Sequence, residues 1–244
     1  AEYVCAFKPN SAFYEQHGPA GMRALQRVIA HIHAHHPTIP VLLDAKRADI
    51  GSTSRAYARA VFDAYQADAV TLHPYLGAEA LSPFLERADR GIFILCRTSN
   101  PGAGELQDLA VTSTGADQSP DQATEPLYLH VARVVAERWN ARGNCGLVVG
   151  ATYPAELAAV RAAAGDLPIL VPGIGAQGGD VAAAVRAGRD SQGYGLLLSA
   201  SRGVLYASSA DDFATAAARE AARLRDAIRA EMRAKAPGGT RAAT

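Results

Sequence analysis

The alternation of short apolar runs with longer helix-forming stretches is the feature that most restricts the fold of this chain. Runs rich in branched aliphatic residues, such as 40–44 and 168–171, are each followed by a stretch with apolar residues at helical spacing. This order predicts parallel βαβ units. We expect strands at 3–8, 40–44, 68–72, 91–96, 146–149, 168–171 and 195–199. We expect helices over about 20–36, 52–66, 78–88, 125–141, 154–164, 180–187 and 209–234.

The positions of the charged and glycine-rich segments favour an α/β fold of the (β/α)8 TIM-barrel type. Each of these segments follows a predicted strand, and barrel active sites are built from the loops after the strands. A doubly wound sheet would concentrate its glycine-rich loop after the first strand, whereas here the loop 173–179 follows a late strand. With 244 residues and no repeat or linker, we expect residues 1–244 to form a single barrel domain.

Composition excludes several classes of partner. The formal net charge is +0, so the chain has no basic surface for nucleic acid or an anionic membrane. No apolar run approaches the roughly 20 residues of a membrane span, and the opening residues do not resemble a signal peptide. Cys5, Cys96 and Cys145 each lie in an apolar run, which predicts buried free thiols. We therefore expect a cytoplasmic protein with no nucleic-acid or membrane partner.

A charged stretch follows the predicted strand 40–44. Asp44 and Lys46 are two residues apart, so on an extended chain their side chains point to the same face. Asp49 follows near the strand's end, and Ser52 and Thr53 are suitable N-cap residues for the next helix. Such a stretch is compatible with a solvated ion pair that stabilises little. Its place at the carboxyl end of a strand also suits an active site, and we favour that interpretation.

Two loops after the last predicted strands have the residues of an anion site. The glycine-rich loop 173–179 lets backbone N–H groups approach an anion, and Gln177 adds an amide donor. Arg202, after the final strand, supplies a planar guanidinium that suits a phosphate. Each signal is weak alone, but together they predict a phosphate monoester as ligand.

The charged stretch would then face this ligand, with Lys8 one strand earlier. An array of lysines between aspartates keeps Lys46 protonated and in place, ready to stabilise a developing carbanion and then protonate it. No carboxylate cluster indicates a metal and no nucleotide fingerprint indicates a redox cofactor, so we expect neither.

Three other segments carry weaker predictions. His31 and His35 lie one turn apart and with His33 and His36 form a histidine-rich helix end; a metal site is possible there, but a polar helix end is the preferred interpretation. Residues 98–124 form a long polar segment, either an active-site lid or disordered, and we favour the lid. The tail 236–244 is expected to be frayed.

These residues resemble the orotidine 5′-monophosphate decarboxylases, in particular the bacterial branch with the signature Asp-Ala-Lys-Arg-x-Asp-Ile-Gly-x-Thr. The matching segments extend through most of the chain. They are Phe7-Lys8-Pro9-Asn10, Ala12-Phe13-Tyr14-Glu15 with Gly18, Asp44–Thr53, Pro74-Tyr75-Leu76-Gly77, Thr98-Ser99-Asn100-Pro101-Gly102, Val171–Gly179 and Ser201-Arg202-Gly203.

The resemblance implies decarboxylation of orotidine 5′-monophosphate to UMP in pyrimidine biosynthesis, without cofactor or metal. Asp44, Lys46 and Asp49 resemble the catalytic Asp-Lys-Asp, with Lys46 as proton donor to C6 of the pyrimidine. Lys8 resembles the lysine that contacts the ribose and joins the charged array. In the family, the counterparts of Asp49 and Thr53 reach into the neighbouring subunit's site, which implies a homodimer with shared active sites.

The resemblance also implies the residues that bind the substrate. Ser99 corresponds to the residue that bonds the pyrimidine, and Pro172 and Ile50 correspond to an apolar wall beside it. Gln177 and Arg202 correspond to the phosphate ligands.

In one respect the chain departs from the family pattern. The family has a strand before the one that carries Lys8, ending in an aspartate that binds the ribose, and this first strand is absent from the sequence. We expect upstream residues in the intact protein. Two alternatives stay open: a catalytically dead barrel that binds UMP or phosphate, and a Mg-dependent relative such as hexulose-phosphate synthase or ketogulonate-phosphate decarboxylase, which shares Asp-x-Lys-x-x-Asp.

Overall fold

Six parallel strands form the main sheet of the computed structural model, which describes residues 1–112, 124–175 and 179–234. Hydrogen-bonded neighbours follow the order β1-β2-β3-β6-β7-β8. Chain order and spatial order agree, so each strand lies beside the next one along the sequence. The strands are β1 (Leu42–Arg47), β2 (Ala69–Leu72), β3 (Gly91–Arg97), β6 (Cys145–Val149), β7 (Ile169–Pro172) and β8 (Leu196–Ser199).

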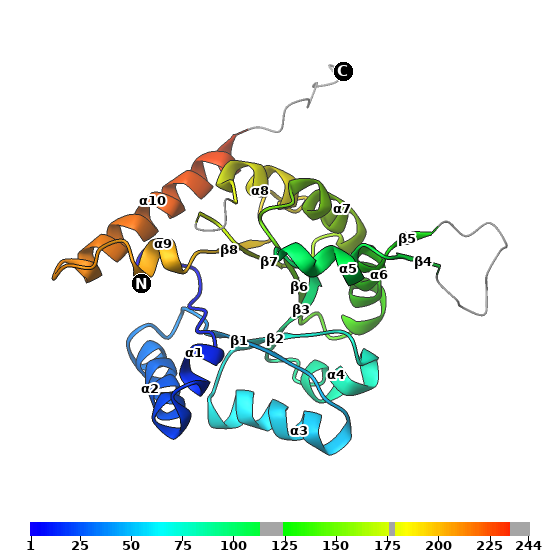
Figure 1. The fold of residues 1–244 in the computed structure, drawn as a ribbon, viewed down its shortest axis with the longest axis horizontal. Coiled ribbons are helices and arrows are strands. Elements are labelled where there is room, and N and C mark those ends of the chain that lie inside the picture. Colours follow the sequence, from blue (N-terminus) through cyan, green and yellow to red (C-terminus); the bar gives the residue numbers. More distant parts are fainter. Residues whose placement is uncertain (113–123, 176–178, 235–244) are drawn as a thin grey trace.

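Helices connect these strands and lie around the outside of the sheet (Figure 1). This is the arrangement of a (β/α) barrel-like fold, as the βαβ pattern predicts. The helices are α1 (Ala12–Glu15), α2 (Gly18–His35), α3 (Gly51–Arg59), η1 (Ala60–Ala64), α4 (Gly77–Leu85), η2 (Pro101–Ala103), α5 (Gly104–Gln107), α6 (Leu127–Val134), η3 (Val135–Trp139), α7 (Pro154–Ala164), α8 (Val181–Gly188), α9 (Arg202–Leu205) and α10 (Phe213–Arg233).

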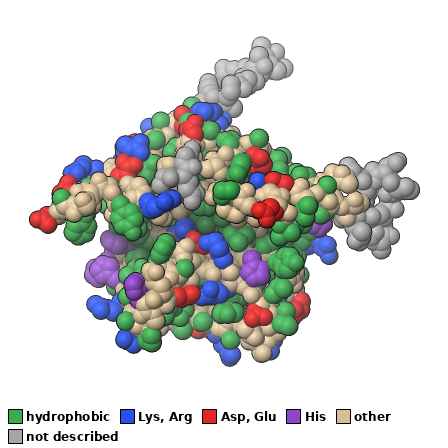
Figure 2. Space-filling model, in the orientation of Figure 1, with side chains coloured by type: hydrophobic (Ala, Val, Ile, Leu, Met, Phe, Trp, Pro, Cys, Tyr) green, Lys and Arg blue, Asp and Glu red, His purple; other side chains and the backbone are tan. Residues whose placement is uncertain are grey.

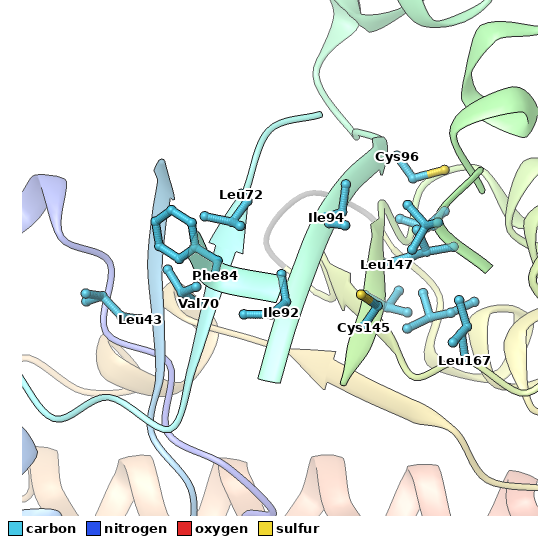
Figure 3. Packing of buried hydrophobic residues seen from close by; sticks show 14 of the residues in the cluster. Leu43, Val70, Leu72, Phe84, Ile92, Ile94, Cys96, Cys145, Leu147 and Leu167 are labelled. Carbon is cyan, nitrogen blue, oxygen red and sulfur yellow. The ribbon is translucent and has the colours of Figure 1, made fainter. Parts of the chain in front are cut away.

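Alternation along the strands divides the core into two layers. Val70 and Leu72 of β2 point outward and belong to the large cluster between sheet and helices, where Figure 3 shows them near Phe84 of α4. Ala69, one residue earlier, belongs to a small cluster on the inner face of the sheet. Because successive side chains on a strand point to opposite faces, each strand contributes side chains to both layers of the core.

Residues 3–8 do not form the regular strand that the sequence predicts. Phe7 and Asn10 make only isolated parallel bridges, to Val41 and Asp44. The Phe7 carbonyl accepts from the Leu42 N–H at 2.8 Å, and the Pro9 carbonyl accepts from the Asp44 N–H at 2.9 Å. Pro9 has no N–H to continue the ladder, which interrupts pairing on this side of β1.

The start of α3 also differs from the prediction. Its N-cap is Ile50, without a side-chain cap, and the helix begins at Gly51. Ser52 and Thr53 therefore lie inside the first turn, not at the cap, because the Ser54 N–H already bonds to the Ile50 carbonyl. The predicted helices 52–66 and 125–141 are each divided, and α3 and α6 end in π-helical turns, η1 and η3.

The long polar segment 98–124 contains elements that the sequence did not indicate. After η2 and α5, strand β4 (Ala110–Val111) pairs antiparallel with β5 (Glu125–Pro126). Residues 113–123 lie outside the described residues, as does the tail 235–244, so neither the lid nor the frayed tail is tested.

The three cysteines are free thiols in different surroundings. Cys96 and Cys145 are buried, as predicted, and burial raises the pKa of their thiols to about 12 and about 11. Cys5 is exposed, so its predicted burial is wrong: it precedes the bridges to β1 and enters no sheet.

The histidine-rich end of α2 was expected to be a polar helix end, with a metal site as the alternative. The rings of His31 and His35 stack at 4.2 Å, and the part of the chain that is described holds no group of three or more potential metal ligands. His33 Nε2 instead contacts Asp68 Oδ2 at 2.9 Å.

Of the helices described, none has the length and apolarity to cross a membrane.

Candidate active site

Most of the site residues predicted from the sequence lie just after strands, at the carboxyl edge of the sheet. Lys46 is the second-last residue of β1, Ser99 follows β3, Pro172 closes β7 and Arg202 begins α9 after β8. Because carboxyl ends of parallel strands meet at one edge, this is where a barrel places its chemistry. The space-filling view shows acidic and basic side chains side by side near the middle of one face, between hydrophobic surfaces (Figure 2).

Asp44 is the centre of a compact charged array. Its side chain is 10% exposed, and its two oxygens divide their partners. Oδ2 accepts from Lys8 Nζ at 2.9 Å and from Asn10 Nδ2 at 3.4 Å. Oδ1 accepts from Lys46 Nζ at 2.6 Å and from Thr71 Oγ1 at 2.9 Å. One buried carboxylate therefore holds two ammonium groups, and the structure brings Lys8, Asp44 and Lys46 together as predicted.

The ionisation of Asp44 follows from these contacts. Burial acts to raise the pKa of its carboxyl group. The charge of Lys8 and the hydrogen bonds from Lys46 and Lys8 oppose burial and together hold the pKa below its ordinary value. Asp44 is thus an anion near neutral pH.

Lys46 occupies an irregular point of its strand. Its φ is 49°, in the left-handed region that residues other than glycine seldom adopt. The β1–β2 pairing shifts register here: Leu43 pairs with Val70, and the next pair is Arg47 with Leu72. The Lys46 side chain is 48% exposed, in contrast to Asp44. A strained backbone next to a charge array is a common property of functional sites.

Asp49, Ile50 and Thr53 do not join this array. In the described part of the chain, the Asp49 carboxylate accepts a hydrogen bond from the Ile50 N–H at 2.7 Å and makes no ion pair with Lys46. Ile50 is 60% exposed, and Thr53 is also exposed. The predicted Asp-Lys-Asp set is therefore divided, with Asp44 and Lys46 in the array and the half-buried Asp49 outside it. Its predicted place in the neighbouring subunit's site stays a prediction.

The loop after β3 places Ser99 close to the end of β6. A Cβ built on Gly150 would lie 2.7 Å from the Ser99 Cβ and 2.9 Å from its backbone N, so only glycine permits this approach. The Gly150 N–H also bonds to the Arg97 carbonyl at 2.8 Å. Ser99 is half-buried in this position.

Arg97 supports the same loop from within. Its side chain is 5% exposed, and its guanidinium lies 4.6 Å from the Tyr153 ring. Nη1 donates to the Thr98 carbonyl at 2.8 Å and Nη2 to Asp108 Oδ2 at 3.1 Å. Nε lies 2.9 Å from Asp108 Oδ1, within ion-pair distance but outside hydrogen-bonding angle. The ion pair thus connects the Ser99 loop to the segment after α5.

The predicted anion-binding loops are described in part. Pro172 is half-buried at the end of β7, and its carbonyl accepts from the Ala151 N–H at 2.9 Å. Gln177 lies outside the described residues, so its role is untested. Arg202 is exposed, and its side chain makes no ion pair with any residue of the described ranges.

Sequence reasoning missed two members of the Asp44 array, Asn10 and Thr71. Asn10 lies within the segment compared with the known family, yet its amide contact with Asp44 depends on the parallel bridge between these residues. Thr71 lies in an apolar strand, two residues after Ala69, so its side chain points to the same inner face of the sheet. A polar residue on the inner face of a buried strand was the signal that was available.

Comparison with known proteins agrees with this geometry. The model of the family described as orotidine 5′-phosphate decarboxylase / HUMPS matches residues 1–219. A curated relative named orotidine 5′-phosphate decarboxylase, from Azoarcus sp. (strain BH72), is 53% identical over 233 residues, which cover 94% of this chain and 80% of the relative. The protein of the same name from Roseiflexus castenholzii is 54% identical, over 96% of this chain and 80% of its own length.

A solved structure extends the similarity to the fold. The Leishmania donovani OMP decarboxylase is 41% identical, with a TM-score of 0.81, and the match covers 96% of this chain and 83% of that chain. Family model, sequence identity and fold therefore point the same way: this chain belongs to the orotidine 5′-phosphate decarboxylase / HUMPS family.

Proposed function

We propose that this protein decarboxylates orotidine 5′-monophosphate to UMP in pyrimidine synthesis. The observation that carries the proposal is the buried Asp44 carboxylate, which holds the ammonium groups of Lys8 and Lys46 at the carboxyl edge of the sheet. The names of the relatives from Azoarcus and Roseiflexus support it. The reaction needs no cofactor in this proposal.

Lys46 is the proton donor. When the bond between C6 and the carboxylate breaks, CO₂ leaves and the electron pair stays on C6. An ammonium group already in place stabilises this charge and then gives its proton to C6. Asp44 fixes the position of Lys46, and Lys8 completes the array. Because Lys46 is 48% exposed, it regains its proton from solvent once product has left.

The remaining site residues bind the substrate in this proposal. Ser99 bonds the pyrimidine, and Pro172 and Ile50 line an apolar wall. Arg202, together with Gln177, binds the phosphate, because a guanidinium after the last strand suits a phosphate oxygen pair. The exposed side chain of Arg202 supports this role.

The active protein is a homodimer with shared sites. Ile50 and Thr53 are exposed at the start of α3, and the half-buried Asp49 beside them makes no contact with the Asp44 array of its own subunit in the described residues. Tyr75 and Leu76, in the loop before the neighbouring helix α4, are 79% and 43% exposed. Such a mixed apolar and charged surface suits an interface through which Asp49 and Thr53 complete the partner's site. We place the dimer in the cytoplasm.

The decisive experiment follows loss of the orotate chromophore when the protein is mixed with orotidine 5′-monophosphate. We expect turnover by the wild-type chain and a loss of about 10²- to 10⁴-fold in Lys46→Ala. Equal turnover by Lys46→Ala would contradict the mechanism. Absence of turnover with intact UMP binding would instead identify a catalytically dead barrel.

The same assay separates a Mg-dependent relative. Hexulose-phosphate synthases share the pattern Asp-x-Lys-x-x-Asp, which in this chain is Asp44, Lys46 and Asp49. The description of the matched family names HUMPS beside orotidine 5′-phosphate decarboxylase. Turnover of orotidine 5′-monophosphate should be unchanged in EDTA. Turnover that EDTA abolishes and Mg²⁺ restores would favour the metal-using alternative.

Mixed subunits test the shared site. Lys46→Ala and Asp49→Ala homodimers should each be nearly inactive. After exchange, half of the sites in a hybrid dimer combine both mutations and half combine neither, so activity should return. No recovery, with hybrid dimers demonstrated by mass spectrometry, would show that Asp49 serves its own subunit.

A further inference from the structure

The ladder between β1 and β2 has a gap at Thr71. Leu43 pairs with Val70 and Arg47 pairs with Leu72, so the three residues 44–46 lie opposite Thr71 alone. A bulge of this kind leaves backbone groups of the longer strand without their ladder partners. Lys46, with its left-handed φ of 49°, lies at the end of the bulge.

The Thr71 hydroxyl fills this gap. Its oxygen accepts the Lys46 backbone N–H at 3.0 Å, and its proton is donated to Asp44 Oδ1 at 2.9 Å. A threonine hydroxyl has one proton, so these two bonds fix its direction. The same Oδ1 atom accepts from Lys46 Nζ at 2.6 Å. Thr71 therefore bonds to the acid of the array and to the backbone of the proton donor at once.

The Thr71 side chain is shielded from solvent on the inner face of the sheet. Thr71 is 1% exposed. Leu42, two residues before Asp44 on β1, is 2% exposed, and Ala69, two residues before Thr71 on β2, is 8% exposed. Removal of the hydroxyl would take away the only acceptor that the described residues give the part-buried Lys46 N–H, and the bulge would have to change to satisfy it. The direction of the Lys46 side chain depends on that bulge.

We propose that Thr71 is a positioning residue for the decarboxylation, acting through Asp44 and Lys46 and not through the substrate. Its hydroxyl holds the carboxylate and the bulged backbone in one geometry, so that the Lys46 ammonium group points to the reacting carbon. This inference rests on the proposed function. It assigns the role to the hydroxyl group and not to the methyl group of Thr71.

Isosteric and conservative variants separate the two groups. Thr71→Val keeps the shape and removes the hydroxyl, whereas Thr71→Ser keeps the hydroxyl and removes the methyl group. We expect kcat of Thr71→Val to fall about 10- to 100-fold with KM changed less than about twofold, since misplacement affects the proton transfer more than binding. Thr71→Ser should restore kcat to within a few-fold of wild type.

Ser54→Ala is the matched control. Ser54 is fully buried, and its hydroxyl donates to the Ala80 carbonyl between α3 and α4, outside the charged array. It should lower the melting temperature, as Thr71→Val does, with kcat unchanged. Should Thr71→Val fail to fold, Thr71→Ala takes its place, because it removes the hydroxyl and adds no atom.

The outcomes are distinct from those of the proposed function. A wild-type chain that does not decarboxylate the substrate overturns both. Wild-type turnover with kcat unchanged in Thr71→Val overturns the positioning role alone. A Thr71→Ser variant as slow as Thr71→Val also overturns it, since the effect would then belong to the methyl group. A pH–kcat profile displaced in Thr71→Val and normal in Thr71→Ser would support it, because a stability effect alone leaves this profile in place.

Discussion

Lys46 Nζ lies 2.6 Å from Asp44 Oδ1, yet the lysine side chain is 48% exposed and the aspartate side chain 10%. The anion is therefore fixed by the protein while the cation faces the site. This asymmetry suits a group that must transfer a proton, since its partner stays in place before and after transfer.

The proton of Lys46, and not its charge alone, should be essential. Lys46→Arg keeps a cation beside Asp44, but a guanidinium, whose pKa is well above that of an ammonium group, is a poor proton donor. We expect kcat to fall by about 10²- to 10⁴-fold, nearly as far as in Lys46→Ala. Steady-state kinetics with orotidine 5′-monophosphate will measure this, and an arginine variant within tenfold of wild type would argue for a purely electrostatic role.

The pH dependence of stability should carry the signature of Asp44. Its pKa in the folded protein lies below its ordinary value of 3.8, so between the two values the unfolded chain binds more protons. The stabilisation is complete above 3.8 and is lost as pH falls through the folded pKa.

Urea unfolding of wild type and Asp44→Asn from pH 7 to pH 3 tests this sign. The wild-type free energy of unfolding should decrease more steeply at the acidic end than that of the variant, whose residue 44 does not titrate. Parallel pH profiles would contradict the assignment.

The close approach of Ser99 to Gly150 should be visible in substrate binding. In Gly150→Ala the new methyl group would lie 2.9 Å from the Ser99 backbone, so the loop must move. We expect KM to rise about tenfold and stability to fall by about 1–3 kcal/mol. Gly143→Ala is the control: its φ is +69° with open space around it, so it should cost about 1 kcal/mol and leave KM unchanged.

Arg97 and Asp108 should respond unequally to mutation, because Arg97 is 5% exposed and Asp108 is 46% exposed. Asp108→Ala leaves a buried guanidinium without its counter-charge, and we expect a loss of about 2–3 kcal/mol, reduced from the value for a fully buried pair by solvent screening. Arg97→Met leaves a carboxylate that water can solvate, and should cost about 1 kcal/mol. Chemical denaturation will rank the two, and the reverse order would contradict the burial argument.

Much of the fold is predictable because its elements are locally encoded. Helix 154–164 was predicted with the residues of α7, and the strands of the main sheet lie within a few residues of their predicted positions. The prediction of a strand at 3–8 is wrong, because the apolar pattern of these residues does not show that Pro9 interrupts their pairing with β1. The short pairing of β4 with β5 has too few residues to give a periodic pattern.

The site was predictable where charged residues occur in or beside an apolar segment, because such residues indicate a functional role. Asp44, Lys46 and Lys8 stand out in an apolar context, and they do meet. Thr71 is a common strand residue, and its role depends on the register shift opposite it, which no local pattern specifies. Asp49, which was expected to reach the neighbouring subunit's site, accepts the Ile50 N–H and makes no ion pair with Lys46 in the described residues.

Residues 7–11 lie beside β1 as a short strap, held by backbone bonds such as those from Leu42 to Phe7 and from Asp44 to Pro9. Lys8 is carried by this strap, so the charge array depends on a segment that pairs with β1 through isolated bridges alone. Local opening of a segment costs less free energy than global unfolding. If the strap opened, the array would lose Lys8 while the rest of the barrel stayed folded by circular dichroism. Amide hydrogen exchange at Leu42 and Asp44, faster than in the neighbouring strands, would report how often this happens.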